Sequence, residues 1–245
     1  MLTRHRTLIT AFAIGAASGA GITCADTVTM SFEGTGRGSN VRATFFDDDA
    51  INVFAGQLRH DITSGTGQAA ALVGEHRTFC ADFDQRVSSA SSMFTVVAPV
   101  DLLVQGQPLG ADRAQALLGI FFTFGSAAIN PDATNDFAAA FQLAVWEILY
   151  DFNADAGASS LNLTGGNIRF TKTSGSALGS GIVNQFNTIV GAIASEGAVN
   201  GLFGLQSGVR QDQLIYGNSL VPAPGALAVA AMGALAVTRR RRAVR

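Results

Sequence analysis

The most nucleophilic side chain of the sequence is a cysteine in a run of alternating residues. Phe79, Ala81 and Phe83 alternate with Cys80 and Asp82. Because successive side chains of a strand point to opposite faces, this spacing predicts a strand with an aromatic row on one face. The thiol then points the other way, among polar neighbours, and is placed to contact another layer of the protein.

The number of cysteines limits what this thiol can do. The chain has two, and Cys24 lies in a segment that we expect to be removed (below). Cys80 would remain as the single thiol of an exported protein, so no internal disulfide is possible. Such a thiol indicates intermolecular pairing or special chemistry, or it is simply buried and inert.

A cysteine hydrolase would need a base next to this thiol, and the nearest histidine in the sequence is His76. Residues four apart on a strand share a face but lie roughly 13 Å apart, too far for direct proton transfer. No second cluster of cysteine and histidine offers a metal site, and no glycine-rich phosphate loop is present. We therefore expect neither a metal nor a cofactor.

The strongest predicted helix spans residues 135 to 152, with Thr134 or Asn135 as its cap. Its apolar stripe has helical spacing and consists of Phe137, Phe141, Ala144, Val145, Ile148 and Phe152. Gln142 lies in this helix, and Trp146 follows one turn later on the same side. Taken alone, such a glutamine is usually a solvated edge residue.

The rest of the chain is predicted to contain strands first and then a mixture of helices and strands. Residues 26 to about 104 have a β pattern, in which His60 falls on an apolar row and is predicted to be a core histidine. A helix is expected from Ala111 with Gly125 marking its stop, followed by further short elements at 167–173 (strand), 182–194 (helix) and 211–216 (strand). The predicted fold class is α+β, with a β-rich first half, a sheet or barrel, packed on a helical segment.

Two short motifs resemble those of thioester domains, which are known from bacterial surface adhesins. They are Phe79-Cys80-Ala81-Asp82 and Gln142-Leu143-Ala144-Val145-Trp146, the family's second motif usually having Ile where Val145 stands and Thr where Phe141 precedes it. The resemblance implies an internal thioester between the side chains of Cys80 and Gln142. It also implies that Phe79, Asp82, Ala144 and Trp146 support the site.

The two ends of the chain differ from its middle. Residues 1–25 have the pattern of a secretory signal peptide, with Arg4 and Arg6 before an apolar stretch and small residues at the expected cleavage site. Residues 26–220 would form the exported domain. Residues 221–238 form an uncharged run long enough for a transmembrane helix, and an arginine cluster follows it.

This tail is similar to the PEP-CTERM sorting signal of bacterial exported proteins. The resemblance rests on Val221, Pro222 and Pro224, on the hydrophobic stretch, and on the cluster Arg239, Arg240, Arg241 and Arg242; Ala223 stands where the family usually has Glu. It implies recognition by an exosortase-type enzyme, membrane anchoring through the C-terminus or release after processing, and a place at the cell surface or in the extracellular matrix.

Charge and composition exclude other classes. Hydrophobic residues make up 48% and charged residues 14% of the chain, which excludes a disordered protein. All 18 acidic residues but only 9 of the 16 basic ones lie between residues 26 and 220, so this part carries 9 − 18 = −9 charges. An acidic body is a poor partner for nucleic acid.

Asp151, Asn153 and Asp155 have the spacing of a calcium loop, but its glycine and terminal glutamate are missing, and a polar helix end is the preferred interpretation.

From these observations we expect an exported protein that attaches covalently, through the Cys80–Gln142 thioester, to surface or matrix ligands that bear amines or hydroxyls. It would act once, in adhesion, and would not turn over as an enzyme. The main alternative is a structural protein of an exopolysaccharide or biofilm matrix that binds non-covalently and keeps Cys80 as a free thiol. A cysteine-dependent enzyme ranks third.

Overall fold

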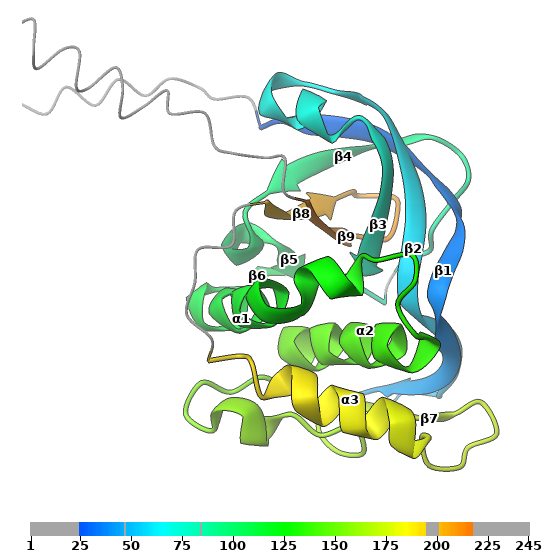
Figure 1. Cartoon of the computed structure of the whole chain (residues 1–245). Helices are drawn as coiled ribbons and strands as arrows, with labels where there is room; N and C mark the ends of the chain where they lie inside the picture. The colour runs from blue at the N-terminus through cyan, green and yellow to red at the C-terminus, as the bar shows by residue number, and fades with distance from the viewer. Residues whose placement is uncertain (1–24, 47, 84, 195–200, 218–245) are drawn as a thin grey trace, which may run out of the picture.

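The computed structural model describes residues 25–46, 48–83, 85–194 and 201–217 as a large antiparallel sheet covered by helices (Figure 1). The predicted α+β class is confirmed at this level. The predicted signal peptide, apart from Ala25, and the whole sorting tail from Val221 onward lie outside the described residues. Among the described helices, none is long and apolar enough to cross a membrane.

The main sheet has seven strands in the order β2-β3-β9-β8-β4-β1-β7. Their bounds are β1 Thr27–Phe45, β2 Ile51–Gly65, β3 Gly74–Cys80, β4 Ser92–Val97, β7 Ile168–Lys172, β8 Leu202–Gln206 and β9 Gln213–Tyr216. At its start β1 pairs with both β2 and β4, so six strands close on themselves and β7 extends the other end of β1. Two short strands, β5 Leu103–Val104 and β6 Gln107–Pro108, form a separate pair.

Close contact between β1 and β2 depends on two glycines. Gly38 and Gly56 are paired across the hairpin, and both have φ values in the left-handed region (154° and 152°). A Cβ atom on Gly38 would lie 2.3 Å from the backbone oxygen of Ala55. Only glycine fits this irregular pairing, where the register of the two strands shifts.

Two separate cores fill the fold. The smaller lies inside the closed part of the sheet and contains buried side chains from five of its strands: Val28, Met30, Ile62, Phe94, Leu205 and Ile215. The larger lies between the sheet and the helices α1 Ala111–Ala128, α2 Asn135–Tyr150 and α3 Ser180–Val190 (Figure 1). Three short 3₁₀ segments complete the described elements: η1 Gly67–Leu72, η2 Pro99–Asp101 and η3 Gly157–Ser160.

Helix α2 is the central element of the larger core. The Thr134 hydroxyl accepts a hydrogen bond from the backbone N–H of Phe137, as expected of a cap. Every residue from Ala138 to Tyr150 is buried, because strands, α1 and α3 surround the helix. The sequence pattern had suggested a one-sided apolar stripe, whereas the helix is enclosed on all sides.

Two predictions about where elements end are wrong, and one strand was missed. Gly125 does not stop α1, which continues to Ala128; instead, the glycine makes room for Tyr216, whose ring carbon would lie 2.7 Å from a Cβ there. The strand that carries the thiol ends at Cys80, so the alternation predicted through Phe83 stops there. Strand β8 was not predicted at all.

Candidate functional site at Cys80 and Gln142

The two residues singled out from the sequence meet where α2 crosses the end of β3. The Gln142 Oε1 atom accepts a hydrogen bond from the backbone N–H of Cys80 at 2.8 Å. Its Nε2 atom donates to the backbone carbonyl of the same cysteine at 2.9 Å. The pairing of β3 with β2 ends at Thr78. Beyond that residue, the Gln142 side chain takes the place of β2 as the hydrogen-bond partner of the β3 backbone.

Gln142 is fully buried, with 0% of its surface exposed. The alternative in which this residue is a solvated edge glutamine is therefore wrong for this chain. A buried primary amide must satisfy its polar atoms, and here the Cys80 backbone takes both ends of it. The arrangement fixes the Gln142 carboxamide beside the residue that carries the thiol.

The Cys80 thiol is buried and donates a hydrogen bond to the backbone carbonyl of Asp82 at 2.7 Å. Burial raises the pKa of the thiol well above its usual range, and the nearby Asp82 charge raises it further. The Asp82 backbone and the Trp146 indole lower the pKa of the thiol, but these effects are smaller. The resting group is thus a neutral thiol and not a thiolate.

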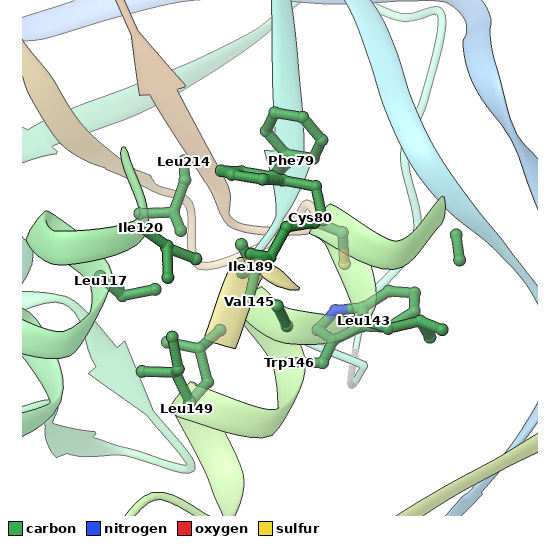
Figure 2. Close-up of a cluster of buried hydrophobic side chains, with 14 of the residues drawn as sticks. Phe79, Cys80, Leu117, Ile120, Leu143, Val145, Trp146, Leu149, Ile189 and Leu214 are labelled. Carbon is green, nitrogen blue, oxygen red and sulfur yellow. The ribbon is translucent and has the colours of Figure 1, made fainter. Parts of the chain in front are cut away.

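Aromatic side chains surround the site on both faces of the strand. Phe79 packs on Phe141, with ring centroids 4.8 Å apart. The sulfur of Cys80 points the other way, toward Trp146, whose buried indole N–H makes no full hydrogen bond to any described residue (Figure 2). Phe83, which we had predicted on the same face as Phe79, instead packs on Trp146 at 4.5 Å, because the chain leaves the sheet after Cys80. The thiol therefore lies between aromatic rings and Asp82, which is one of the polar neighbours expected from the sequence.

Asp82 holds the loop that follows the thiol. Its carboxylate accepts hydrogen bonds from the backbone N–H groups of Gln85 and Asp212, which ties the loop to the start of β9. Ala144, the remaining predicted support residue, is a fully buried small side chain of α2. All six residues predicted for the site are thus buried: Phe79, Cys80, Asp82, Gln142, Ala144 and Trp146.

A cleft of about 500 Å³ leads from the surface to the sulfur. Cys80 and Trp146 line it together with Phe83 and residues of the β1–β2 hairpin. The thiol is consequently buried but lies at the wall of a cavity that a small group could enter. This cleft was not predicted, because its walls come from segments that lie far apart in the sequence.

The other candidate residues, His60 and Asp151, have structural roles. His60 is buried and hydrogen-bonded to Thr78, and burial lowers its pKa to about 4, as expected of a core histidine. The two carboxylate oxygens of Asp151 accept from the backbone N–H groups of Asn167 and Ile168, so this residue closes a loop. Within the described part of the chain, no group of three or more acidic, histidine or cysteine residues could hold a metal ion.

Two buried acids were not singled out in the sequence: Asp212, whose pKa burial raises to about 6, and Glu147. Glu147 follows Trp146 in α2, is completely buried, and accepts a hydrogen bond from the backbone N–H of Asn162 through Oε2. Burial raises its pKa to about 8, and its Oε1 atom has no hydrogen-bond partner among the described residues. A glutamate within an otherwise uncharged run, from Phe137 to Tyr150, was the available signal.

Searches of protein-family models, curated proteins and solved structures find no match to this chain. The interpretation of the site therefore depends on its own geometry.

Proposed function

We propose that Cys80 and Gln142 join in an internal thioester, through which the exported protein attaches covalently to a surface or matrix partner. The observation that carries the proposal is the two-point hydrogen bonding of the Gln142 amide to the backbone of Cys80. It holds the Gln142 carboxamide against the backbone of the residue that carries the thiol, with both side chains buried, in a chain with one cysteine in its described part.

The contacts suit the chemistry of bond formation. The Cys80 N–H already donates to Gln142 Oε1, and the same donor would stabilise the negative charge that develops on this oxygen during attack. Holding the reacting groups in place can supply roughly 7–11 kcal/mol of the barrier of such a reaction. An unactivated amide needs this help because it is a poor electrophile.

The step balances without any co-reactant. The Cys80 sulfur bonds to the Gln142 side-chain carbonyl carbon, the bond from that carbon to Nε2 breaks, and the thiol proton leaves with the nitrogen as ammonia. The sulfur must first turn away from the Asp82 carbonyl. That carbonyl also accepts from Gln211, so it keeps a partner when the thiol departs.

The same surroundings would preserve the product. Trp146 stacks on Phe170 and packs against Phe83, so aromatic rings cover this side of Cys80. A nucleophile on a partner would attack the thioester carbonyl, the carbon–sulfur bond would break, and the proton would pass to Cys80. The partner would remain bound to the former Gln142 side chain, and the protein would have acted once.

The alternative function is a non-covalent structural matrix protein. One observation favours it: both polar atoms of the Gln142 amide are already satisfied, and the thiol has its own acceptor in Asp82. A glutamine in this state is a stable structural clamp and has no need to react.

Intact mass separates the two functions. The thioester form weighs less than the calculated mature chain by one ammonia, and methylamine adds its own mass while releasing a titratable thiol. Cys80→Ala, which cannot form the bond, serves as the control and has its calculated mass before and after methylamine. A wild-type protein with the full calculated mass and a freely titratable thiol contradicts the thioester.

Export and anchoring complete the proposal. We infer that the signal peptide at residues 1–25 directs secretion and that the tail from Val221 to Arg245 holds the protein in the envelope until an exosortase-type enzyme processes it. These roles rest on the sequence patterns alone.

A further inference from the structure

The indole N–H of Trp146 is a buried donor without a full hydrogen bond. Trp146 is 1% exposed, and its Nε1 atom has no hydrogen-bond partner among the described residues. A buried donor left unpaired costs free energy, so a native structure that keeps one has a reason to do so. The surroundings of this atom indicate which acceptor it serves.

The indole nitrogen faces the sulfur of Cys80. In Figure 2 it lies on the edge of the ring that is turned toward this sulfur. The contact lowers the pKa of the Cys80 thiol, although burial of the sulfur and the Asp82 charge have larger effects in the opposite direction. A neutral thiol is a weak acceptor, whereas an ionised group accepts a hydrogen bond strongly. The donor is therefore suited to a charged form of Cys80 and not to the resting thiol.

Helix α2 presents two partners of Cys80 from one face. Gln142 and Trp146 are four residues apart, so their side chains are neighbours on the helix surface. The Gln142 amide pairs with the Cys80 backbone, and Trp146 lies one turn further along, beside the sulfur. The same face thus carries the carboxamide that would react and a donor for the charge that the sulfur would carry.

Packing holds the Trp146 ring in this orientation. Phe170 of β7 stacks on it, with ring centroids 5.7 Å apart and 16° between the ring planes. Phe83 packs against it as well, with centroids 4.5 Å apart. A donor that is already in place needs no reorganisation when charge develops, which is the condition for strong electrostatic stabilisation.

We propose that the Trp146 indole N–H is a catalytic hydrogen-bond donor to the Cys80 sulfur and stabilises negative charge on it. In thioester formation, this charge arises as the sulfur loses its proton and attacks the Gln142 carbonyl carbon. In the later reaction, the nitrogen of a partner amine bonds to that carbon, the carbon–sulfur bond breaks, and its electron pair goes to the sulfur. The thiolate then takes the proton that the amine nitrogen releases. This catalytic role rests on the proposed function, whereas the contact between the donor and the sulfur does not.

Expulsion of the sulfur is the step that depends most on this donor. Burial and the Asp82 charge raise the pKa of the Cys80 thiol well above its usual range, and a thiolate of high pKa leaves slowly. A hydrogen bond to the charged sulfur offsets part of this effect. Its loss should slow the reaction of the thioester with an amine about 10- to 100-fold.

Benzothienylalanine in place of Trp146 tests the donor, because this analogue has the shape of tryptophan but carries a sulfur where the indole has its N–H. Trp146 is the single tryptophan of the chain, so an expression strain that cannot make tryptophan introduces the analogue at this residue alone. Intact mass then follows the addition of methylamine to the full-length protein with time. We expect the analogue protein to react more slowly than the wild type by the factor given above.

Phe170→Leu is the matched control, since it removes the ring that stacks on Trp146 and keeps the N–H. If Trp146 only shields the sulfur, Phe170→Leu speeds the reaction and the analogue, which has the same shape, leaves the rate unchanged. If the N–H stabilises the sulfur, the analogue slows the reaction and Phe170→Leu does not. The proposal is overturned if the analogue protein reacts as fast as the wild type, or if Phe170→Leu slows the reaction equally.

A second measurement applies if the wild type has its full calculated mass, a result that refutes the thioester. Alkylation of the free Cys80 thiol by iodoacetamide at about pH 9 then reports its thiolate form. A higher pKa makes the thiolate rarer but more nucleophilic, so loss of the donor should slow alkylation about three- to tenfold. Equal or faster alkylation of the analogue protein refutes the donor, and the two proposals therefore fail separately.

Discussion

Replacing Cys80 with alanine measures how strongly the proposed bond braces the fold. The thioester would close a loop between residues 62 positions apart. By the chain-entropy estimate used for disulfides, such a link stabilises the folded state by about 4 kcal/mol. Bond formation removes the Gln142 Nε2 donor from the Cys80 carbonyl, which offsets this by about 1 kcal/mol.

The substitution itself adds a small cost. Removing a buried sulfur lowers the free energy of unfolding by about 1 kcal/mol, whether or not the bond exists. Cys80→Ala keeps the backbone groups that pair with the Gln142 amide, so no buried polar group is orphaned. We therefore expect a loss of about 4 kcal/mol if the wild type carries the thioester, and about 1 kcal/mol if it carries a free thiol.

Urea unfolding of the mature proteins gives both values by linear extrapolation. Methylamine-treated wild-type protein provides an internal check, because it should lose most of its advantage over Cys80→Ala. If Cys80→Ala lies within about 1 kcal/mol of the wild type and methylamine changes nothing, the bracing argument is wrong.

Three other predictions test separate parts of the structure. In the Cys80→Ala background, Gln142→Leu leaves the backbone N–H and carbonyl of residue 80 without hydrogen-bond partners. It should therefore lower the free energy of unfolding in urea by a further 2–6 kcal/mol or so. A loss under about 1 kcal/mol contradicts a structural role of the Gln142 amide. Burial raises the pKa of Glu147 from 4.5 to about 8, so the folded protein keeps this proton to a higher pH than the unfolded chain does. Its contribution to the free energy of unfolding is therefore fully present below pH 4.5 and is lost as pH rises toward 8. Glu147→Gln should remove this pH dependence in unfolding experiments, and an unchanged profile refutes the assignment. Deleting Val221 to Arg245 should release the exported domain into the medium, whereas membrane retention on cell fractionation contradicts the C-terminal anchor.

Local patterns predicted the elements of the site well. The alternation around Phe79 and Cys80 gave a strand with these two side chains on opposite faces, and the spacing from Phe137 to Ile148 gave helix α2. The cap at Thr134 was also recognisable. These features depend on residues close together in the sequence.

What the sequence could not supply depends on contacts between distant segments. Helix α2, which carries Gln142, is enclosed by β1, β2 and α3, and no periodicity within the helix indicates these neighbours. Gly125 has the residue type of a helix stop, but its small size serves contact with Tyr216, far along the chain. The cleft likewise forms only where the loop after β3 meets the β1–β2 hairpin and α2.

The position of β9 in the sequence delays completion of the sheet around Cys80. Strand β3 pairs with its sequence neighbour β2 as far as Thr78, and its last residues pair with β9, which begins more than 130 residues later. Ala81 also donates to the carbonyl of Asp212, just before β9 begins. Long-range pairing of this kind is slow, so the end of β3 that carries Cys80 obtains its second neighbouring strand late in folding. The final geometry of the site is therefore set by the last strand of the sheet and not by the hairpin that starts it.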